Sequence, residues 1–146
     1  KPSTIFHLSI TADRFKESRM HLLYIALGGA IGSLLRHFAA MAITQVAGTW
    51  LPWGIMIVNV SGSFAIGVAA GSLVGTPAGM DTTALRYFLM VGLCGGYTTF
   101  SSFSLHTLQM LQVGMVGRAF LHVLLSVVCC VVATAAGYAV TTAITR

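Results

Sequence analysis

Four long apolar runs, separated by short polar stretches, dominate the pattern of hydrophobic and polar positions along this chain. The runs cover residues 22–43, 53–74, 85–111 and 119–144. Each reaches the roughly 20 residues that an α-helix needs to cross the hydrocarbon core of a bilayer. No remaining stretch is long enough for a soluble domain. The pattern therefore predicts an all-α membrane protein with four transmembrane helices in a single domain.

The first 19 residues differ from the rest because polar and charged residues are mixed through them. They lack the apolar core and the small-residue cleavage site of a signal peptide. Met20 is followed at once by apolar residues and has the character of a natural start. We expect residues 1–19 to be a mis-called start, a leader or a cytoplasmic tail, and residues 20–146 to form the transmembrane domain.

The third run contains an interruption, V-G-L-C-G-G-Y-T-T-F-S-S-F-S, at residues 91–104. Paired glycines weaken a helix, and irregular backbone at membrane depth is tolerated only where protein or a water-filled cavity surrounds it. The sequence therefore predicts that the third helix is broken near its middle and that the break is the functional centre.

Hydroxyls and aromatic rings are concentrated at this break. Phe100 and Phe103 are three residues apart, so a resumed helix places them on one face. The hydroxyl side chains are Thr98, Thr99, Ser101, Ser102 and Ser104. Small donors and ring edges, which carry the positive part of the aromatic quadrupole, are suited to a small anion.

Composition excludes several classes of protein. The chain is 56% hydrophobic and 8% charged, with a mean hydropathy of +0.87, which is far from a soluble domain. Its acidic residues, Asp13, Glu17 and Asp81, lie outside the apolar runs. Proton-coupled transporters usually keep a carboxylate inside the bilayer. The nearest alternative among four-helix proteins is a small multidrug-type transporter. It would require such a carboxylate, and the apolar runs of this chain contain none.

The positive charges bear on membrane topology and do not indicate a nucleic-acid-binding surface. The net charge is +5, but the eight Lys and Arg are scattered without interleaved aromatic residues, so a nucleic-acid partner is not expected. Counted from Met20, Arg86 and Arg146 fall on one side of four spans, and Arg36 and Arg118 on the other. This absence of a positive-inside bias permits insertion in both orientations and hence an antiparallel homodimer. If residues 1–19 are present, their basic residues would instead favour the amino terminus inside: Lys1, Arg14, Lys16 and Arg19.

Neither a disulfide nor a cysteine–histidine metal site is expected, because no paired CxxC or His/Cys spacing is present. The three cysteines lie in apolar runs, where they behave as small hydrophobes. These are Cys94, Cys129 and Cys130. An enzyme is also disfavoured, since Ser101 or Ser104 lies near His106 without a third orienting group or an oxyanion motif.

Several polar residues inside the other runs allow two interpretations. Asn59 makes an interhelical hydrogen bond or lines a pore with its donors. Ser126 shares a helical face with His122 and Cys130, and either belongs to a polar track or bonds back to a preceding carbonyl. Arg36 snorkels to the interface or draws anions to a pore mouth. Whether a track from Ser126 extends to His122 or Cys130 stays open.

Three runs together resemble the fluoride channel family, also called Fluc or CrcB. They are G-G-Y-T-T-F-S-S-F at residues 95–103, V-N-V-S-G-S-F-A-I-G at residues 58–67 and G-G-A-I-G-S-L-L-R at residues 28–36. The resemblance covers residues 20–146 in order and spacing. It implies a protomer of four helices, an antiparallel dual-topology homodimer with two fluoride pores, and a place in the bacterial inner membrane.

The resemblance also implies roles for individual residues. Phe100, Phe103 and Asn59 match residues that face the fluoride path, and Ser126 matches a hydroxyl of the polar track on the fourth helix. We also expect Thr99, at the break, to be one of the residues that line the pore. Two departures stand out: Ser102 occupies a usual Thr position, and Cys130 lies where a hydroxyl is expected.

Two further features follow from the same resemblance. The helix break corresponds to a structural sodium ion at the dimer interface, bound by main-chain carbonyls that match Gly95 and Thr98. Arg36 matches the family's first-helix arginine, at the pore mouth. Free carbonyls at a helix break need a cation or donors, so a sodium ion is physically reasonable there.

The sequence thus predicts a passive channel that lets fluoride leave the cytoplasm and so confers fluoride resistance. Neutral donors suit conduction because a strongly basic pore would hold a small anion too tightly to release it. A non-conducting membrane assembly subunit stays open as a second alternative, since glycine-rich helix faces suffice for it.

Overall fold

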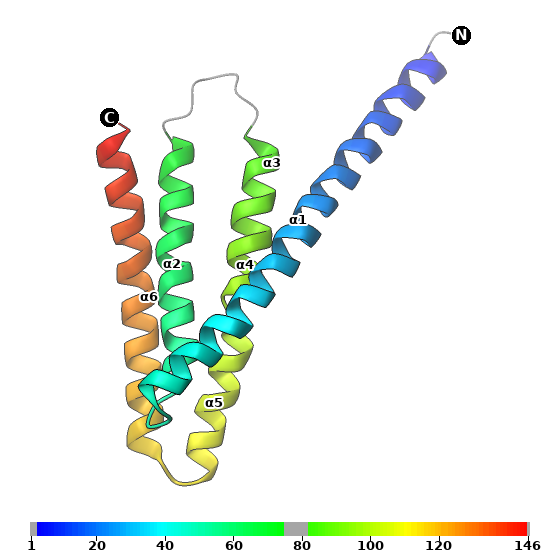
Figure 1. The fold of residues 1–146 in the computed structure, drawn as a ribbon. Helices are drawn as coiled ribbons and strands as arrows, with labels where there is room; N and C mark the ends of the chain where they lie inside the picture. Colours follow the sequence, from blue (N-terminus) through cyan, green and yellow to red (C-terminus); the bar gives the residue numbers. More distant parts are fainter. Residues whose placement is uncertain (1–2, 75–81, 146) are drawn as a thin grey trace.

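The computed structural model describes residues 3–74 and 82–145, with side chains described from Ser18 onward. Asp81 and Arg146, which enter the charge pattern above, lie outside the described residues, as do the side chains of Asp13 and Glu17. The described residues are helical almost throughout, and they form a bundle crossed by one long helix (Figure 1).

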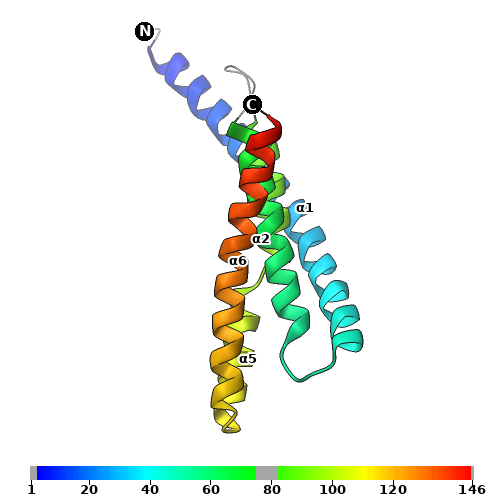
Figure 2. The same cartoon turned by 90° about the vertical axis from the view of Figure 1, so that its left-hand side faces the viewer.

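The helical elements follow one another as four columns. The first two columns are α1 (Ser3–Ala47) and α2 (Trp53–Val74). The third consists of α3 (Thr83–Leu85), the π-helix η1 (Arg86–Cys94), α4 (Gly95–Tyr97) and α5 (Phe100–Gln112), and the fourth is α6 (Val116–Ile144). When the molecule is turned, α6 lies in front of α2 and the third column, and the carboxyl-terminal end of α1 stands apart from them (Figure 2).

Four segments are long and apolar enough to cross a membrane. They are Ser18–Ala47, Trp53–Val74, Thr83–Gln112 and Val116–Ile144. The prediction of an all-α protein with four membrane-spanning helices is therefore confirmed for the described part of the chain. The second span begins and ends where the apolar pattern placed it, whereas the other three extend a few residues further.

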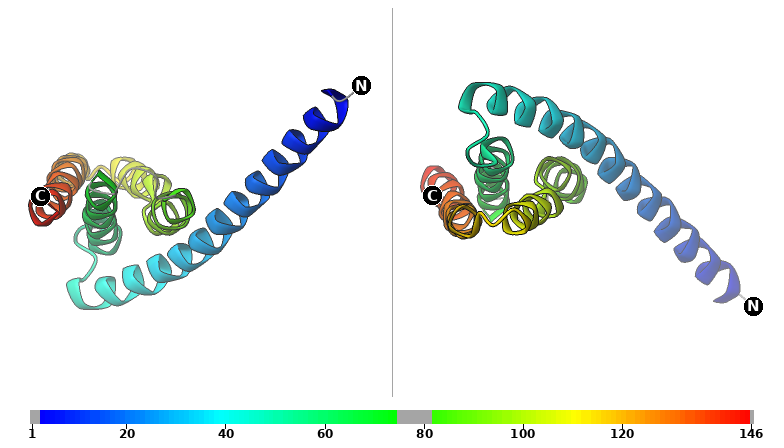
Figure 3. Two further views of the ribbon diagram at one scale, coloured as in Figure 1. Left: turned by 90° about the horizontal axis from the view of Figure 1, so that it is seen from above. Right: turned by 90° about the horizontal axis from the view of Figure 1, so that it is seen from below.

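Helix packing is asymmetric. α2 packs most extensively on α6, and α1 packs mainly on η1 and α2. Viewed along the bundle, α1 runs obliquely past α2 and the third column and stays away from α6 (Figure 3). The site described below is therefore built from α2, the third column and α6.

Glycines allow the helices to approach closely at the α2–α6 contact. A Cβ atom added at Gly67 would collide with the carbonyl oxygen of Thr134, and one at Gly137 would collide with the carbonyl oxygen of Phe64. In a bilayer, where lipid competes with protein for apolar surface, such close backbone contact is the main source of helix association. The α2–α6 pair thus forms a rigid wall beside the third column.

Candidate functional site

The third column is interrupted between α4 and α5 by two extended residues. Thr98 has φ −81° and ψ 156°, and Thr99 has φ −150° and ψ 114°. The Thr99 hydroxyl then caps α5 by accepting a hydrogen bond from the Ser102 N–H at 3.2 Å. The helix therefore ends at Tyr97, two extended residues follow, and a new helix capped by Thr99 begins at Phe100.

The extended residues come after the paired glycines, which themselves remain helical in α4. A Cβ atom at Gly96 would lie 2.6 Å from the carbonyl oxygen of Gly29 on α1. Gly96 is thus required because α1 approaches the third column closely, and not because the chain turns at this residue. The hydroxyl residues that follow, and not the glycines, adopt the irregular backbone.

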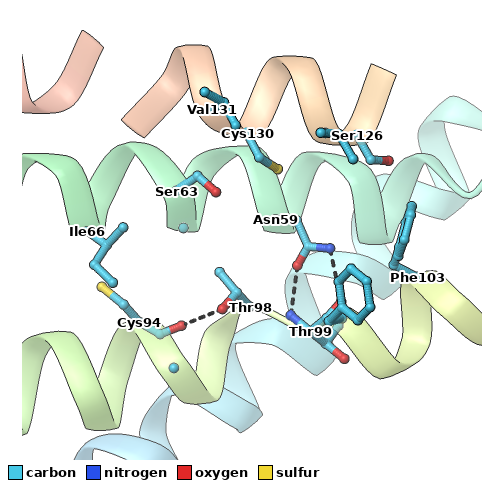
Figure 4. A pocket seen from close by; sticks show the side chains of 14 residues that line it. Asn59, Ser63, Ile66, Cys94, Thr98, Thr99, Phe103, Ser126, Cys130 and Val131 are labelled. Carbon is cyan, nitrogen blue, oxygen red and sulfur yellow. Dashed lines mark hydrogen bonds between the residues drawn. The ribbon is translucent and has the colours of Figure 1, made fainter. Parts of the chain in front are cut away.

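Asn59 on α2 holds the break in place. Its Oδ1 accepts a hydrogen bond from the Thr99 N–H at 2.7 Å, and its Nδ2 donates to the Thr99 carbonyl at 3.0 Å (Figure 4). An extended residue has lost its helical partners, and the carboxamide supplies both replacements. Of the two interpretations of Asn59, the tertiary hydrogen bond is present, and the second N–H of Nδ2 is left to serve the adjoining pocket.

These hydrogen bonds also decide which carbonyls lose their helical donors. In a continuous α-helix the Gly95 carbonyl would accept from the Thr99 N–H, and the Thr98 carbonyl from the Ser102 N–H. Those donors instead bind Asn59 Oδ1 and Thr99 Oγ1. The Gly95 and Thr98 carbonyls are the pair expected to hold a sodium ion, and oxygen atoms released in this way suit a hard cation.

A pocket of about 380 Å³ adjoins the break, between α2, α5 and α6 (Figure 4). All five residues predicted to face a pore line it: Asn59, Thr99, Phe100, Phe103 and Ser126. Gly95, Thr98 and Cys130 line it as well. Residues that are distant in the sequence are thus brought to one cavity.

The pocket lining is neutral. It combines a carboxamide, hydroxyls and thiols with apolar side chains, and no Lys, Arg, Asp or Glu is among its lining residues. Sequence reasoning did not name Ser63, Ile66, Val127 and Val131, which complete the wall. Ser63 and Ile66 lie one and two helical turns after Asn59, and this spacing is the signal that could have identified them, whereas Val127 and Val131 lie one and five residues after Ser126.

The two phenylalanines differ sharply in exposure. Phe100 is 76% exposed, whereas Phe103 is 8% exposed. Their ring centroids are 5.1 Å apart with the planes tilted by 42°. Phe103 in turn packs against the His122 ring at 5.0 Å. The aromatic groups therefore form a series that leads from the surface of a single chain into its interior.

Ser126 on α6 lies at this interior end and is 4% exposed. Its Oγ lies 3.5 Å from Nδ1 of His122, one turn earlier on the same helix. Elsewhere on α6, Thr134 donates to the Cys130 carbonyl at 3.0 Å, which is the back-bonding that Ser126 could have adopted. The contact of Ser126 is instead with a buried imidazole.

Arg36 lines a different pocket, of about 690 Å³, on the α1 side of the third column. Ser102 and His106 of α5 line this second pocket too. The predicted pore-mouth residue is therefore not in contact with the first pocket. Different residues of α5 line the two pockets: Phe100 and Phe103 the first, and Ser102 and His106 the second.

Comparison with known proteins gives a consistent result. Residues 23–138 match the family model described as CrcB-like protein, Camphor Resistance (CrcB). A protein of Opitutus terrae named fluoride-specific ion channel FluC is 48% identical over 117 residues, covering 80% of this chain and 88% of its own length. A protein of Rhodospirillum rubrum with the same name is 44% identical over 124 residues, covering 82% and 92%.

Proposed function

The chain belongs to the CrcB family, and we propose that it is a fluoride-selective ion channel that carries cytoplasmic fluoride out of the cell down its electrochemical gradient. It is a multi-pass bacterial membrane protein, as its four spans and its relatives indicate. Its curated relatives are named fluoride-specific ion channels, and the chain covers most of their length.

The observation that carries the proposal is the neutral pocket beside the helix break. A fluoride ion that leaves water needs hydrogen-bond donors, and the pocket offers the second N–H of Asn59 and the hydroxyl of Ser126, while the Thr99 hydroxyl donates to Ser102 Oγ at 3.2 Å. Phenyl edges add favourable electrostatics without a formal charge. Weak, multiple contacts of this kind allow an ion both to enter and to leave.

A passive channel is sufficient for fluoride resistance. Hydrogen fluoride crosses membranes as a neutral acid and dissociates in the cytoplasm, where the anion is trapped. The negative interior potential drives an anion outward, by about 2.3 kcal/mol per 100 mV. No coupling group is then needed, in keeping with the position of all three acidic residues outside the apolar runs.

The proposal includes an antiparallel homodimer that holds a sodium ion at its centre. The balance of arginines across the spans supports insertion in both orientations. Phe100 borders the pocket yet is 76% exposed in one chain, so a second chain would complete the wall beside it. The carbonyls of Gly95 and Thr98, deprived of their helical donors, are the groups that would bind sodium.

The proposal is tested in a bacterial strain that lacks its own fluoride channel. Expression of this chain should restore growth on fluoride medium and lower the fluoride retained by the cells. An uncoupler collapses both the proton gradient and the membrane potential, yet preloaded cells should still release fluoride down its concentration gradient, because a channel needs no proton coupling. Release that stops while the concentration gradient is still present would favour a proton-coupled transporter, and absence of any rescue by a membrane-inserted protein would contradict the proposal.

A further inference from the structure

A third pocket, of about 560 Å³, lies where two pairs of helices are connected. Residues 48–52 join α1 to α2 there, and residues 113–115 join α5 to α6. Figure 1 shows both connections at the end of the bundle opposite the two termini of the chain. Because four membrane-spanning segments begin or end at these connections, the pocket lies at the boundary between the hydrocarbon core and the lipid headgroups.

Arg118, in the first turn of α6, brings a positive charge to this pocket. Its Nη1 donates to the sulfur of Met115 at 3.6 Å, and a thioether is a weak acceptor. No aspartate or glutamate is found among the residues whose side chains the structure describes, so no carboxylate there neutralises the charge. A guanidinium carries five N–H donors, and most of them are therefore available to an oxygen acceptor from outside the described chain.

Trp50, on the connection between α1 and α2, orients this guanidinium. The central carbon of the Arg118 guanidinium lies over the Trp50 ring, 5.3 Å from its centroid. The next residue, Leu51, is only 1% exposed and anchors the connection, whereas Trp50 itself is 51% exposed. Tryptophan is the typical side chain of the membrane–water interface. A guanidinium that rests on an aromatic face keeps the N–H groups of its edge free, and this planar fork matches a phosphate.

Much of the remaining pocket wall is apolar. The apolar side chains come from the start of α2, from α5 and from the two connections: Leu51, Pro52, Ile55, Met110, Val113 and Met115. A free inorganic anion gains nothing from such a wall, because apolar surface stabilises only apolar groups placed against it. A cation beside an apolar wall at the membrane boundary instead fits a molecule with an anionic head and a hydrocarbon tail.

We propose that this pocket binds an anionic glycerophospholipid of the surrounding bilayer. The phosphate accepts hydrogen bonds from the Arg118 guanidinium beside Trp50, and an acyl chain lies along the apolar wall. A lipid held in this way links the connection between α1 and α2 to the start of α6. The lipid site is independent of fluoride conduction, because none of these residues lines the pocket beside the helix break.

The test uses Trp50 as a reporter in the full chain, with Trp53→Phe to make it the sole tryptophan. The protein is reconstituted in phosphatidylcholine vesicles that contain a small fixed fraction of brominated phosphatidylglycerol or brominated phosphatidylcholine, since bromine quenches the fluorescence of a tryptophan that it contacts. One basic residue should enrich the anionic lipid beside Trp50 roughly fivefold. Arg118→Gln should abolish this preference, and Arg86→Gln, at the start of η1, should retain it.

Equal quenching by the two brominated lipids would overturn the proposal, and so would an equal loss of preference in the Arg86→Gln protein, which would indicate a general surface charge effect. Sodium phosphate that removes the preference when sodium chloride of the same ionic strength does not would identify a site for free phosphate. No quenching by either lipid would mean that protein, such as a second copy of the chain, covers the pocket. The comparison of the two lipids is made with Arg118 intact, so a misfolded Arg118→Gln protein does not affect it.

Discussion

Asn59 and Thr99 are 40 residues apart in the sequence, yet the carboxamide of the first binds both main-chain polar groups of the second. The contact fixes α2 to the break between α4 and α5. It also withdraws the Thr99 N–H from the Gly95 carbonyl, so one pair of hydrogen bonds shapes both the pocket beside the break and one of the carbonyls that we propose to bind sodium. The helix break is therefore a supported structure and not a local failure of helix propensity.

Replacement of Asn59 by Leu should destabilise the protein and abolish most fluoride flux. The change keeps the number and branching of the side-chain heavy atoms but leaves the Thr99 N–H and carbonyl without partners, at about 1–3 kcal/mol for each group. Thermal unfolding in detergent and fluoride efflux measure the two effects. Ser63→Ala, in the same pocket wall, is the matched control. A fully stable, fully active Asn59→Leu protein would show that the contact is dispensable.

Substitutions at the two phenylalanines of the pocket should affect fluoride flux and stability to different extents. Phe100→Ile should lower fluoride flux and affect unfolding less than Phe103→Ile does, because within one chain the Phe100 side chain is 76% exposed. Phe103→Ile should lower flux and also destabilise the protein, because the buried ring packs against His122. Phe120→Ile, at 68% exposure on α6 and outside the pocket, should change neither. Normal flux in both pore variants would remove the rings from the mechanism.

Glycine packing between α2 and α6 should be sensitive to one methyl group. Gly137→Ala forces the added carbon against the Phe64 carbonyl, and overpacking of this kind costs about 1–3 kcal/mol. Gly117→Ala, on the same helix, meets nothing within 4 Å and should be neutral or slightly stabilising. The difference between their unfolding midpoints checks the contact. Equal midpoints would mean that the helices are less closely packed than described here.

Removal of sodium should weaken the assembly. If the Gly95 and Thr98 carbonyls bind the ion, exchange of sodium for a large organic cation such as N-methylglucamine leaves these oxygens unsatisfied. Fluoride flux and the dimer fraction on size-exclusion chromatography should both fall, and added sodium should restore them. Flux and dimer fraction that are unchanged after exhaustive exchange would argue against the ion.

The spans could be predicted from the sequence because hydropathy alone constrains them in a bilayer. The second span matches residues 53–74, where Pro52 and Trp53 mark its start. The interruption at residues 91–104 was also recognisable. Its detailed form was not, because the paired glycines remain helical and the extended backbone falls on Thr98 and Thr99.

The sequence did not contain enough information to predict how the helices pack against one another. Whether Asn59 would bind Thr99, or His122 would contact Ser126 and Phe103, depends on how three helices meet. The spacing of His122 and Ser126 indicated a shared face, but it did not reveal that His122 would be fully buried. That burial follows only from the packing of α5 against α6, which places the Phe103 ring 5.0 Å from the His122 ring.

Fluoride release from liposomes that contain the purified protein tests the central claim most directly. The vesicles are loaded with fluoride or with chloride, valinomycin supplies the compensating potassium flux, and an ion-selective electrode records release. The account predicts rapid fluoride release and little chloride release, with protein-free vesicles and Phe120→Ile as controls. Equal release of both ions, or none from a folded and correctly inserted sample, would contradict it.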